Sequence, residues 1–306
     1  MSITEVPSQR DSKRKASPPR YRSGPVRRSK RSGWGKARMG LFNASAIVLG
    51  FYALFPVLWI IITSLKPQSQ LTTQPVTLIP SSITLGSYRT ALGQAPFGRY
   101  YINSLVVSIS STVATLFLGT LAGYAIARLR FRFKKTVLLV ILGFSFLPPI
   151  TLVVPLFNLF RHFALLNTYW ALIIPYTFLS LPICVWLMNA YLQDLPKELE
   201  EAAMVDGLNY FGAFIRIILR VAIPGIVTAG LIIFATDWNE FLLALTFMTD
   251  NSMRTLPVGI ALYPGQYTFP WGIISAATVL ALVPVALAVS VFQKRLISGM
   301  TLGAVK

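Results

Sequence analysis

The chain has 306 residues, of which 54% are hydrophobic and 12% charged, and its mean hydropathy of +0.62 argues against ordinary soluble domains. It carries 28 Lys and Arg against 10 Asp and Glu, for a net charge of +18, yet twelve of the basic residues precede residue 41. The positive charge is therefore largely a property of one tail. A single Cys and a single His exclude an internal disulfide and a His/Cys metal cluster, so we expect no bound metal.

Residues 1–40 are rich in Pro, Ser, Gly, Lys and Arg and poor in aliphatic side chains. Such a segment cannot bury enough apolar surface to offset its ordering entropy, so we expect a disordered basic tail. A signal peptide is the competing interpretation, but the apolar run that follows is long enough to span a bilayer. The tail could bind anionic membrane lipids, or it could simply retain this end of the chain in the cytoplasm, which the pattern favours.

Six segments are long and apolar enough for spanning helices, because a bilayer core of about 30 Å needs roughly 20 apolar residues. The predicted fold is an all-α membrane protein with six transmembrane helices in a domain of residues 41–292. The predicted spans are Leu41–Thr63, Ile102–Ala127, Thr136–Phe157, Tyr169–Tyr191, Gly225–Phe247 and Trp271–Phe292.

The connections between the spans differ in charge. Those on the side of both termini carry 23 basic residues and the opposite ones carry five. Basic loops remain in the cytoplasm, so we predict that both termini, including a short tail at 293–306, are cytoplasmic.

Several predicted spans contain proline, which removes a backbone donor and clashes with the preceding turn. These helices should kink or break, and lipid tolerates that only where protein or water satisfies the freed carbonyls. The pattern favours a pathway through the membrane over a simple anchor, although ordinary packing kinks are the alternative. The prolines concerned are Pro148, Pro149, Pro155, Pro175, Pro182 and Pro284.

The connection 192–224 holds five of the ten acidic residues. Asp194 is a suitable N-cap, a short helix should run to about Val205, and Gly207 can adopt the positive φ that ends it. Apolar residues then recur at helical spacing, which predicts a helix, a turn and a second helix. Small residues beside carboxylates indicate an element that docks on a partner. The alternative is an amphipathic hairpin on the membrane surface, which an anionic leaflet would repel.

Two acidic residues, Asp237 and Glu240, fall inside the fifth predicted span, where each would cost about 2.5–3.5 kcal/mol near the centre. Together with Trp238 and Asn239 they offer the acceptors, donor and aromatic face of a cavity for a sugar-sized ligand. The alternatives are that they cap a break in the helix or pair with a basic residue. We favour these alternatives for Asp237 and leave Asn239 and Glu240 open. The predicted substrate pathway comprises Trp238, Asn239 and Glu240.

Other function classes fit less well. A stand-alone ion-coupled transporter using Asp237 and Glu240 would need acids in both halves of the chain, and an intramembrane enzyme would need a recognisable catalytic pair. A nucleic-acid binder would need aromatic residues among the basic ones of the tail. The chain contains no Gly-x4-Gly-Lys-Ser/Thr sequence, so any ATP must be hydrolysed by a partner.

The sequence Glu201-Ala202-Ala203, then Gly207, then Ile217-Ile218-Leu219 resembles the EAA loop of permease subunits from binding-protein-dependent ABC importers. Arg220 stands where the family pattern has Pro, and Pro224 follows four residues later. Further stretches of residues 41–306 are similar to the MalG-type subunits of carbohydrate importers. They are 122–131, 148–168, 237–245 and 298–306.

This resemblance implies a type I ABC importer permease fold in a bacterial inner membrane, with no catalysis and no cofactor of its own. It implies that residues 192–224 couple to a cytoplasmic ABC ATPase dimer, which binds ATP and Mg. It also implies a homologous second permease subunit and an extracytoplasmic binding protein for a sugar, such as an oligosaccharide, a disaccharide or a related polyol glycoside. The implied coupling residues are Glu201, Ala202, Ala203, Asp206, Gly207 and Phe211.

Overall fold

The computed structural model describes residues 33–71, 77–263 and 269–304, and every regular element in these ranges is helical. Its contacts form two units, residues 1–54 and 55–306, and the boundary falls inside the first helix. The longer helices are α1 (Gly33–Leu65), α4 (Phe97–Arg128), α5 (Lys134–Gly143), α6 (Pro149–His162), α7 (Trp170–Asp194), α11 (Ile223–Trp238) and α14 (Trp271–Ala304). The shorter elements are α2 (Gln68–Leu71), α3 (Gly86–Gly93), η1 (Phe144–Phe146), α8 (Glu198–Val205), α9 (Tyr210–Ala213), the π-helical turn η2 (Phe214–Ile218), α10 (Leu219–Val221), α12 (Leu242–Phe247), η3 (Asn251–Met253) and α13 (Leu256–Ala261).

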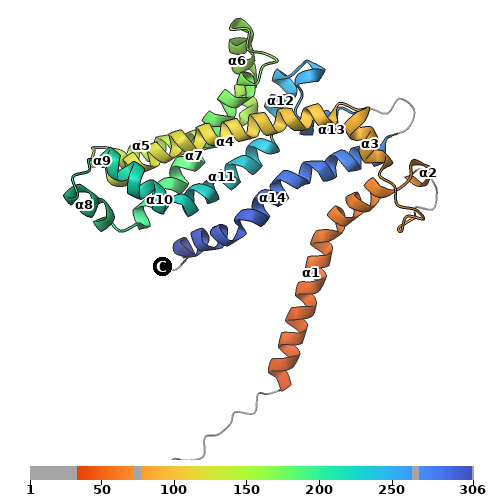
Figure 1. The fold of residues 1–306 in the computed structure, drawn as a ribbon, viewed down its shortest axis with the longest axis horizontal. Helices are drawn as coiled ribbons and strands as arrows, with labels where there is room; N and C mark the ends of the chain where they lie inside the picture. Colours follow the sequence, from red (N-terminus) through yellow and green to blue (C-terminus); the bar gives the residue numbers. More distant parts are fainter. Residues whose placement is uncertain (1–32, 72–76, 264–268, 305–306) are drawn as a thin grey trace, which may run out of the picture. The chain divides into compact units, whose positions relative to one another are not determined.

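Four helices are long and apolar enough to cross a membrane: α4, α7, and most of α1 and of α14. Two bent pairs also qualify if each is counted as one span, with bends of 89° between α5 and α6 and 73° between α9–α10 and α11. Counted in this way, the described residues hold up to six candidate spans, but the second bent pair covers residues 210–238 and not the predicted fifth span Gly225–Phe247. In the second unit, α4, α7, α11 and α14 run side by side, with α8–α10 at one end and α12 and α13 toward the other (Figure 1).

The third predicted span is not one helix. Leu147 has an extended backbone, and Pro148 and Pro149 follow it, with Pro149 starting α6. The residue before a proline avoids the helical region, which explains why the chain turns here. The predicted break is therefore confirmed at this position. Helices α6, α7 and α14, in contrast, continue through Pro155, Pro175, Pro182 and Pro284, so no break occurs there.

The fifth predicted span also ends early, because α11 stops at Trp238 and a new helix begins at Leu242. The connection 192–224 also begins later than predicted, because a proline again ends the preceding helix. Helix α7 runs through Asp194, and Leu195 becomes extended before Pro196, so α8 starts only at Glu198. The prediction of Asp194 as an N-cap was wrong.

Helices extend into both predicted tails. Residues 33–40 form the first turns of α1, and α14 continues to Ala304, past the apolar stretch that marked the predicted span. A helix can continue beyond its apolar stretch when no proline or capping residue ends it. Residues 1–32 of the predicted basic tail lie outside the described residues.

Helices α4 and α7 form the centre of the second unit. A Cβ added at Gly119 would lie 2.4 Å from Sγ of Cys184, and one at Gly123 would lie 2.8 Å from Cβ of Met188. This small-xxx-small pair on α4 lets the two backbones approach as closely as glycine allows. We call these two helices the frame, because α8–α10 and α11 pack against them.

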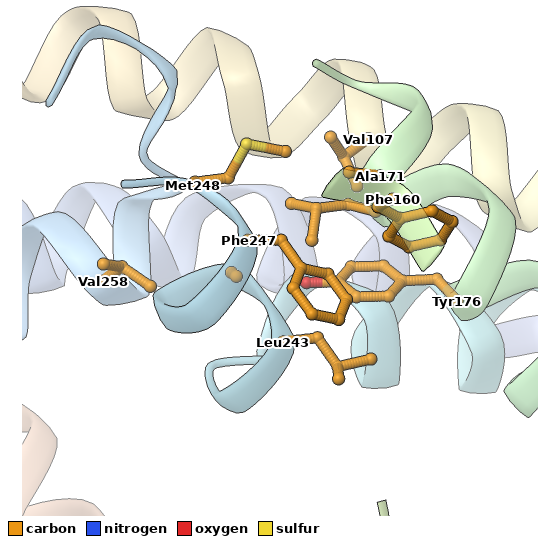
Figure 2. Close-up of a cluster of buried hydrophobic side chains, with 10 residues drawn as sticks. Val107, Phe160, Ala171, Tyr176, Leu243, Phe247, Met248 and Val258 are labelled. Carbon is orange, nitrogen blue, oxygen red and sulfur yellow. The ribbon is translucent and has the colours of Figure 1, made fainter. Parts of the chain in front are cut away.

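A buried hydrophobic cluster holds α6 and α12 against α7. The rings of Phe160 on α6 and Phe247 on α12 meet edge to face with centroids 5.4 Å apart. Figure 2 shows the Tyr176 ring of α7 beside Phe247 and Leu243, with Met248 and Val258 nearby. The cluster fixes α12 in place directly after the break that ends α11.

Candidate functional site

The predicted docking element is a compact hairpin formed by α8, a turn and α9–α10, residues 198–221, which we call the coupling hairpin. Gly207 has φ +87°, its N–H donates to the Met204 carbonyl, and the Leu208 N–H donates to the Ala203 carbonyl, each at 3.0 Å. These two bonds form a Schellman motif, which satisfies the last carbonyls of α8. Asn209 Oδ1 then accepts from the Gly212 N–H at 2.7 Å and starts the second arm. The prediction that Gly207 ends this helix with a positive φ is confirmed.

A buried ion pair attaches the hairpin to the frame. Arg128, the last residue of α4, places Nε 3.0 Å from Oε1 of Glu200 on α8, with side chains only 2% and 8% exposed. Arg128 Nη2 also donates to the carbonyl of Leu195 at the end of α7, at 2.8 Å. Burial raises the pKa of Glu200 above its usual range, and the Arg128 charge opposes that rise. One guanidinium thus joins α4, α7 and α8.

Apolar contacts complete the attachment. The Tyr124 ring on α4 packs on Phe214 in the second arm with centroids 4.5 Å apart. Ala203, Ile218 and Leu192 are 1%, 0% and 0% exposed, so this underside of the hairpin is part of the core. A movement of the hairpin must therefore move α4 and α7, or break this packing.

The opposite face of the hairpin is open. Five of the six predicted coupling residues are exposed, namely Glu201, Ala202, Asp206, Gly207 and Phe211. The sixth, Ala203, is buried, and its small side chain lets α8 pack on the second arm. Val205 is 88% exposed at the tip. Sequence reasoning placed Val205 at the end of the helix but not among the coupling residues, and it did not pair Arg128 with Glu200. An arginine that ends a span is a signal that could have suggested a carboxylate partner.

A groove of about 670 Å³ runs beside the exposed face, between α8 and the chain that follows α4. Arg130 and Phe131 line one wall, and Glu201 and Met204 line the other. The mixture of both charges with apolar side chains is typical of a protein contact surface.

The carboxylate of Asp237 lies inside the bundle and joins three helices. Its Oδ2 accepts from the Ser111 hydroxyl of α4 at 2.5 Å, and its Oδ1 accepts from the Ser180 hydroxyl of α7 at 2.9 Å. Asp237 itself is 6% exposed. In the described part of the chain, the hydrogen-bond partners of this carboxylate are the two neutral hydroxyls, so its side chain neither caps the break nor pairs with a basic residue there.

Glu240 caps the break between α11 and α12. Its carboxylate accepts from the backbone N–H of Leu243 at 2.8 Å and of Ala244 at 3.1 Å, and from the Tyr176 hydroxyl at 2.5 Å. These bonds satisfy the first donors of α12, which is the capping alternative named for this residue.

Trp238 and Asn239, the two residues before Glu240, differ in solvent exposure. Trp238 is 3% exposed, and its indole N–H donates to the Ala281 carbonyl of α14 at 3.0 Å. Asn239 is exposed, and its amide donates to the Ala235 carbonyl at 2.7 Å. Of the three predicted pathway residues, Asn239 is exposed, Glu240 is half-buried and Trp238 is buried.

Comparison with known proteins identifies relatives over most of the chain. The family model described as binding-protein-dependent transport system inner membrane component matches residues 115–302. The sulfoquinovosyl glycerol transport system permease protein SmoH of Agrobacterium fabrum is 43% identical over 87% of this chain and 93% of its own. The trehalose transport system permease protein SugB of Mycobacterium tuberculosis is 39% identical over 85% and 94%. The trehalose/maltose transport system permease protein MalG of Thermococcus litoralis is 36% identical over 87% and 96%.

One solved structure has the same fold. A chain of a bacterial ABC transporter involved in the import of the acidic polysaccharide alginate superposes with a TM-score of 0.71, at 21% identity, over 85% of this chain and 97% of that one. The chain therefore shares the fold of that transporter chain over most of its length.

Proposed function

Because this chain belongs to the family of binding-protein-dependent transport system inner membrane components, we propose that it is a permease subunit of an ABC importer that carries a sugar. Relatives named for sulfoquinovosyl glycerol, trehalose and trehalose/maltose transport support the substrate class. The observation that carries the proposal is the coupling hairpin, whose exposed carboxylates face away from the core while a buried ion pair holds it to α4 and α7.

The hairpin docks on a separate ATPase, which binds ATP and Mg, and this chain has no catalytic role. Glu201 and Asp206 offer charges to that partner, and Gly207 lets the backbone approach it closely. When the ATPase dimer closes, the displaced hairpin pulls on α4 through the Glu200–Arg128 ion pair and through the contact of Phe214 with Tyr124. The 73° bend between α10 and α11 converts that displacement into a movement of α11. Alternating access follows from these coupled movements.

The remaining parts of the assembly follow from the family. The protein lies in the inner membrane of a bacterium with both termini in the cytoplasm, as the distribution of basic residues indicates. A second, homologous permease completes the pathway, and an extracytoplasmic binding protein delivers the sugar. On this subunit, Asn239 faces the pathway, whereas Trp238 and Glu240 hold its backbone at the break.

Purification of the tagged chain from its own host in mild detergent tests this proposal. We expect mass spectrometry to find an ABC ATPase and a second permease with the wild type, and to lose the ATPase in a Glu201→Lys, Gly207→Trp variant. Reconstituted complexes should then take up a sugar only with ATP and the binding protein. Purification of the chain alone, with ATP-independent solute uptake in liposomes, would contradict the proposal.

A further inference from the structure

A second cavity lies at the same end of the bundle as the coupling hairpin and shares the Arg128 and Lys197 side chains with the groove described above. It has a volume of about 370 Å³ and opens between the end of α4, the start of α5 and the end of α7. Its polar wall is formed by Lys134, Lys135, Lys197 and Gln193 beside Arg128, and Leu138 is part of its apolar wall.

The charge of this cavity is strongly positive. Arg128 pairs with Glu200, and the charge of Lys197 acts on the same carboxylate at longer range. Lys134 and Lys135 form no ion pair within the described residues, and no carboxylate lines the cavity. Lys134 and Lys135 occupy the first turn of α5, which contains no acidic residue. Cations at this end of a helix oppose the helix dipole, so two of them are unfavourable unless an anion lies between them.

The surroundings of the cavity indicate where that anion comes from. The lysines lie where two spanning helices, α4 and α7, reach their ends, which is the depth of lipid headgroups. Beyond Leu138, α5 exposes apolar side chains, with Leu139 69% and Val140 56% exposed. A ligand that fits both parts has a phosphate at one end and a hydrocarbon chain at the other.

We propose that this basic pocket, lined by Lys134, Lys135 and Lys197, holds a phosphate group presented by the headgroup of an anionic phospholipid. The lipid phosphate replaces the missing counter-ion at the start of α5, and its acyl chains lie along the apolar face of that helix. The backbone carbonyl of Lys197 also accepts from the N–H groups of Glu200 and Glu201. The bound lipid would therefore contact the base of the coupling hairpin directly.

Native mass spectrometry of the full-length chain, with any co-purifying subunits, tests this site. The protein is titrated with phosphatidylglycerol, with phosphatidylcholine of the same acyl chains, and separately with inorganic phosphate. We expect tighter binding of phosphatidylglycerol than of phosphatidylcholine, and a loss of about 10- to 100-fold in its affinity in the variant Lys134→Gln, Lys135→Gln, Lys197→Gln.

A matched control removes three charges from the same end of the molecule without touching the cavity, by Arg130→Gln, Arg132→Gln, Arg216→Gln. It should retain the preference for phosphatidylglycerol, as should a variant with arginine at all three lysine positions. Equal affinity for the two lipids, or an equal loss in the control, would overturn the proposal. Displacement of phosphatidylglycerol by inorganic phosphate at millimolar concentration would assign the pocket to free phosphate and overturn the lipid as its source.

Discussion

Two pairs of nearby carboxylates, in the coupling hairpin and at the break after α11, are held by different chemistry. In the hairpin, Glu200 is buried against the Arg128 charge and its neighbour Glu201 is exposed. At the break, Asp237 and Glu240 are held by serine and tyrosine hydroxyls and by backbone N–H groups. The ion pair at the hairpin holds α8 against α4. The neutral donors at the break hold the end of α11 against α4 and α7 and fix the turn into α12. The two sites should therefore respond differently to loss of charge.

The largest effect is expected where a buried charge loses its partner. Glu200→Gln leaves the Arg128 guanidinium charged and buried, because arginine cannot release its proton, and should destabilise the protein by about 3–5 kcal/mol. The thermal unfolding midpoint in detergent measures this. Glu201→Gln is the matched control, since it changes the same group one residue away on the exposed face. Equal midpoints for the two variants would show that the buried pair does not hold the hairpin.

The reciprocal change, Arg128→Gln, should be milder and dependent on pH. Burial already raises the pKa of Glu200, and removing the arginine that opposes this shift raises it further. The folded variant then binds a proton that the unfolded chain releases above its ordinary pKa of 4.5, so stability falls as the pH rises from 4.5 through the raised pKa of the folded state. Unfolding midpoints across this range should decline for Arg128→Gln relative to the wild type and not for Glu200→Gln. Parallel profiles for the two variants would contradict this account of the pair.

At the break, Asp237→Asn should cost less than about 1 kcal/mol, because the amide can still accept from one serine and donate to the other. Asp237→Ala leaves the hydroxyls of Ser111 and Ser180 without their shared acceptor and should cost about 1–3 kcal/mol. The difference between the two variants in unfolding midpoint measures the hydrogen bonds separately from the charge. A severe loss in Asp237→Asn would mean that the ionised carboxylate itself is required.

The smallest effect on stability and the largest on transport are expected from Glu201→Lys. Its side chain lies on the exposed face, where a substitution changes stability by less than about 0.5 kcal/mol. Reversal of its charge should nevertheless weaken ATPase docking, so uptake falls while the unfolding midpoint stays the same. Sugar uptake and ATP hydrolysis of the reconstituted complex are the readouts. Undiminished uptake would remove Glu201 from the docking surface.

The sequence predicts the apolar spans of α1, α4, α7 and α14 well, because hydrophobicity over about 20 residues depends on the bilayer alone. It also predicts the helix up to Val205 and the turn at Gly207, since both follow from local caps. It does not distinguish Glu200 from Glu201, because the distinction depends on Arg128, which lies 72 residues away in the chain.

The helix breaks show the same division between local and distant causes. The turn at Pro148 is recognisable from the sequence because a proline restricts the residue before it. The break after Trp238 contains no proline and depends on the Glu240 carboxylate turning back to two N–H groups of α12, with support from Tyr176 on α7. Hydropathy therefore extends the predicted span through a point where tertiary contacts end the helix.

The central claim is that the exposed tip of the coupling hairpin contacts an ATPase, and site-specific crosslinking tests it most directly. Cys184 is 0% exposed, so Val205→Cys adds one accessible thiol at a position that is 88% exposed. In native membranes, a thiol-to-amine crosslinker on Val205→Cys should yield an adduct whose mass spectrum identifies an ABC ATPase. Ile79→Cys, 84% exposed between α2 and α3, should yield none. An ATPase adduct from both positions, or from neither, would contradict the account.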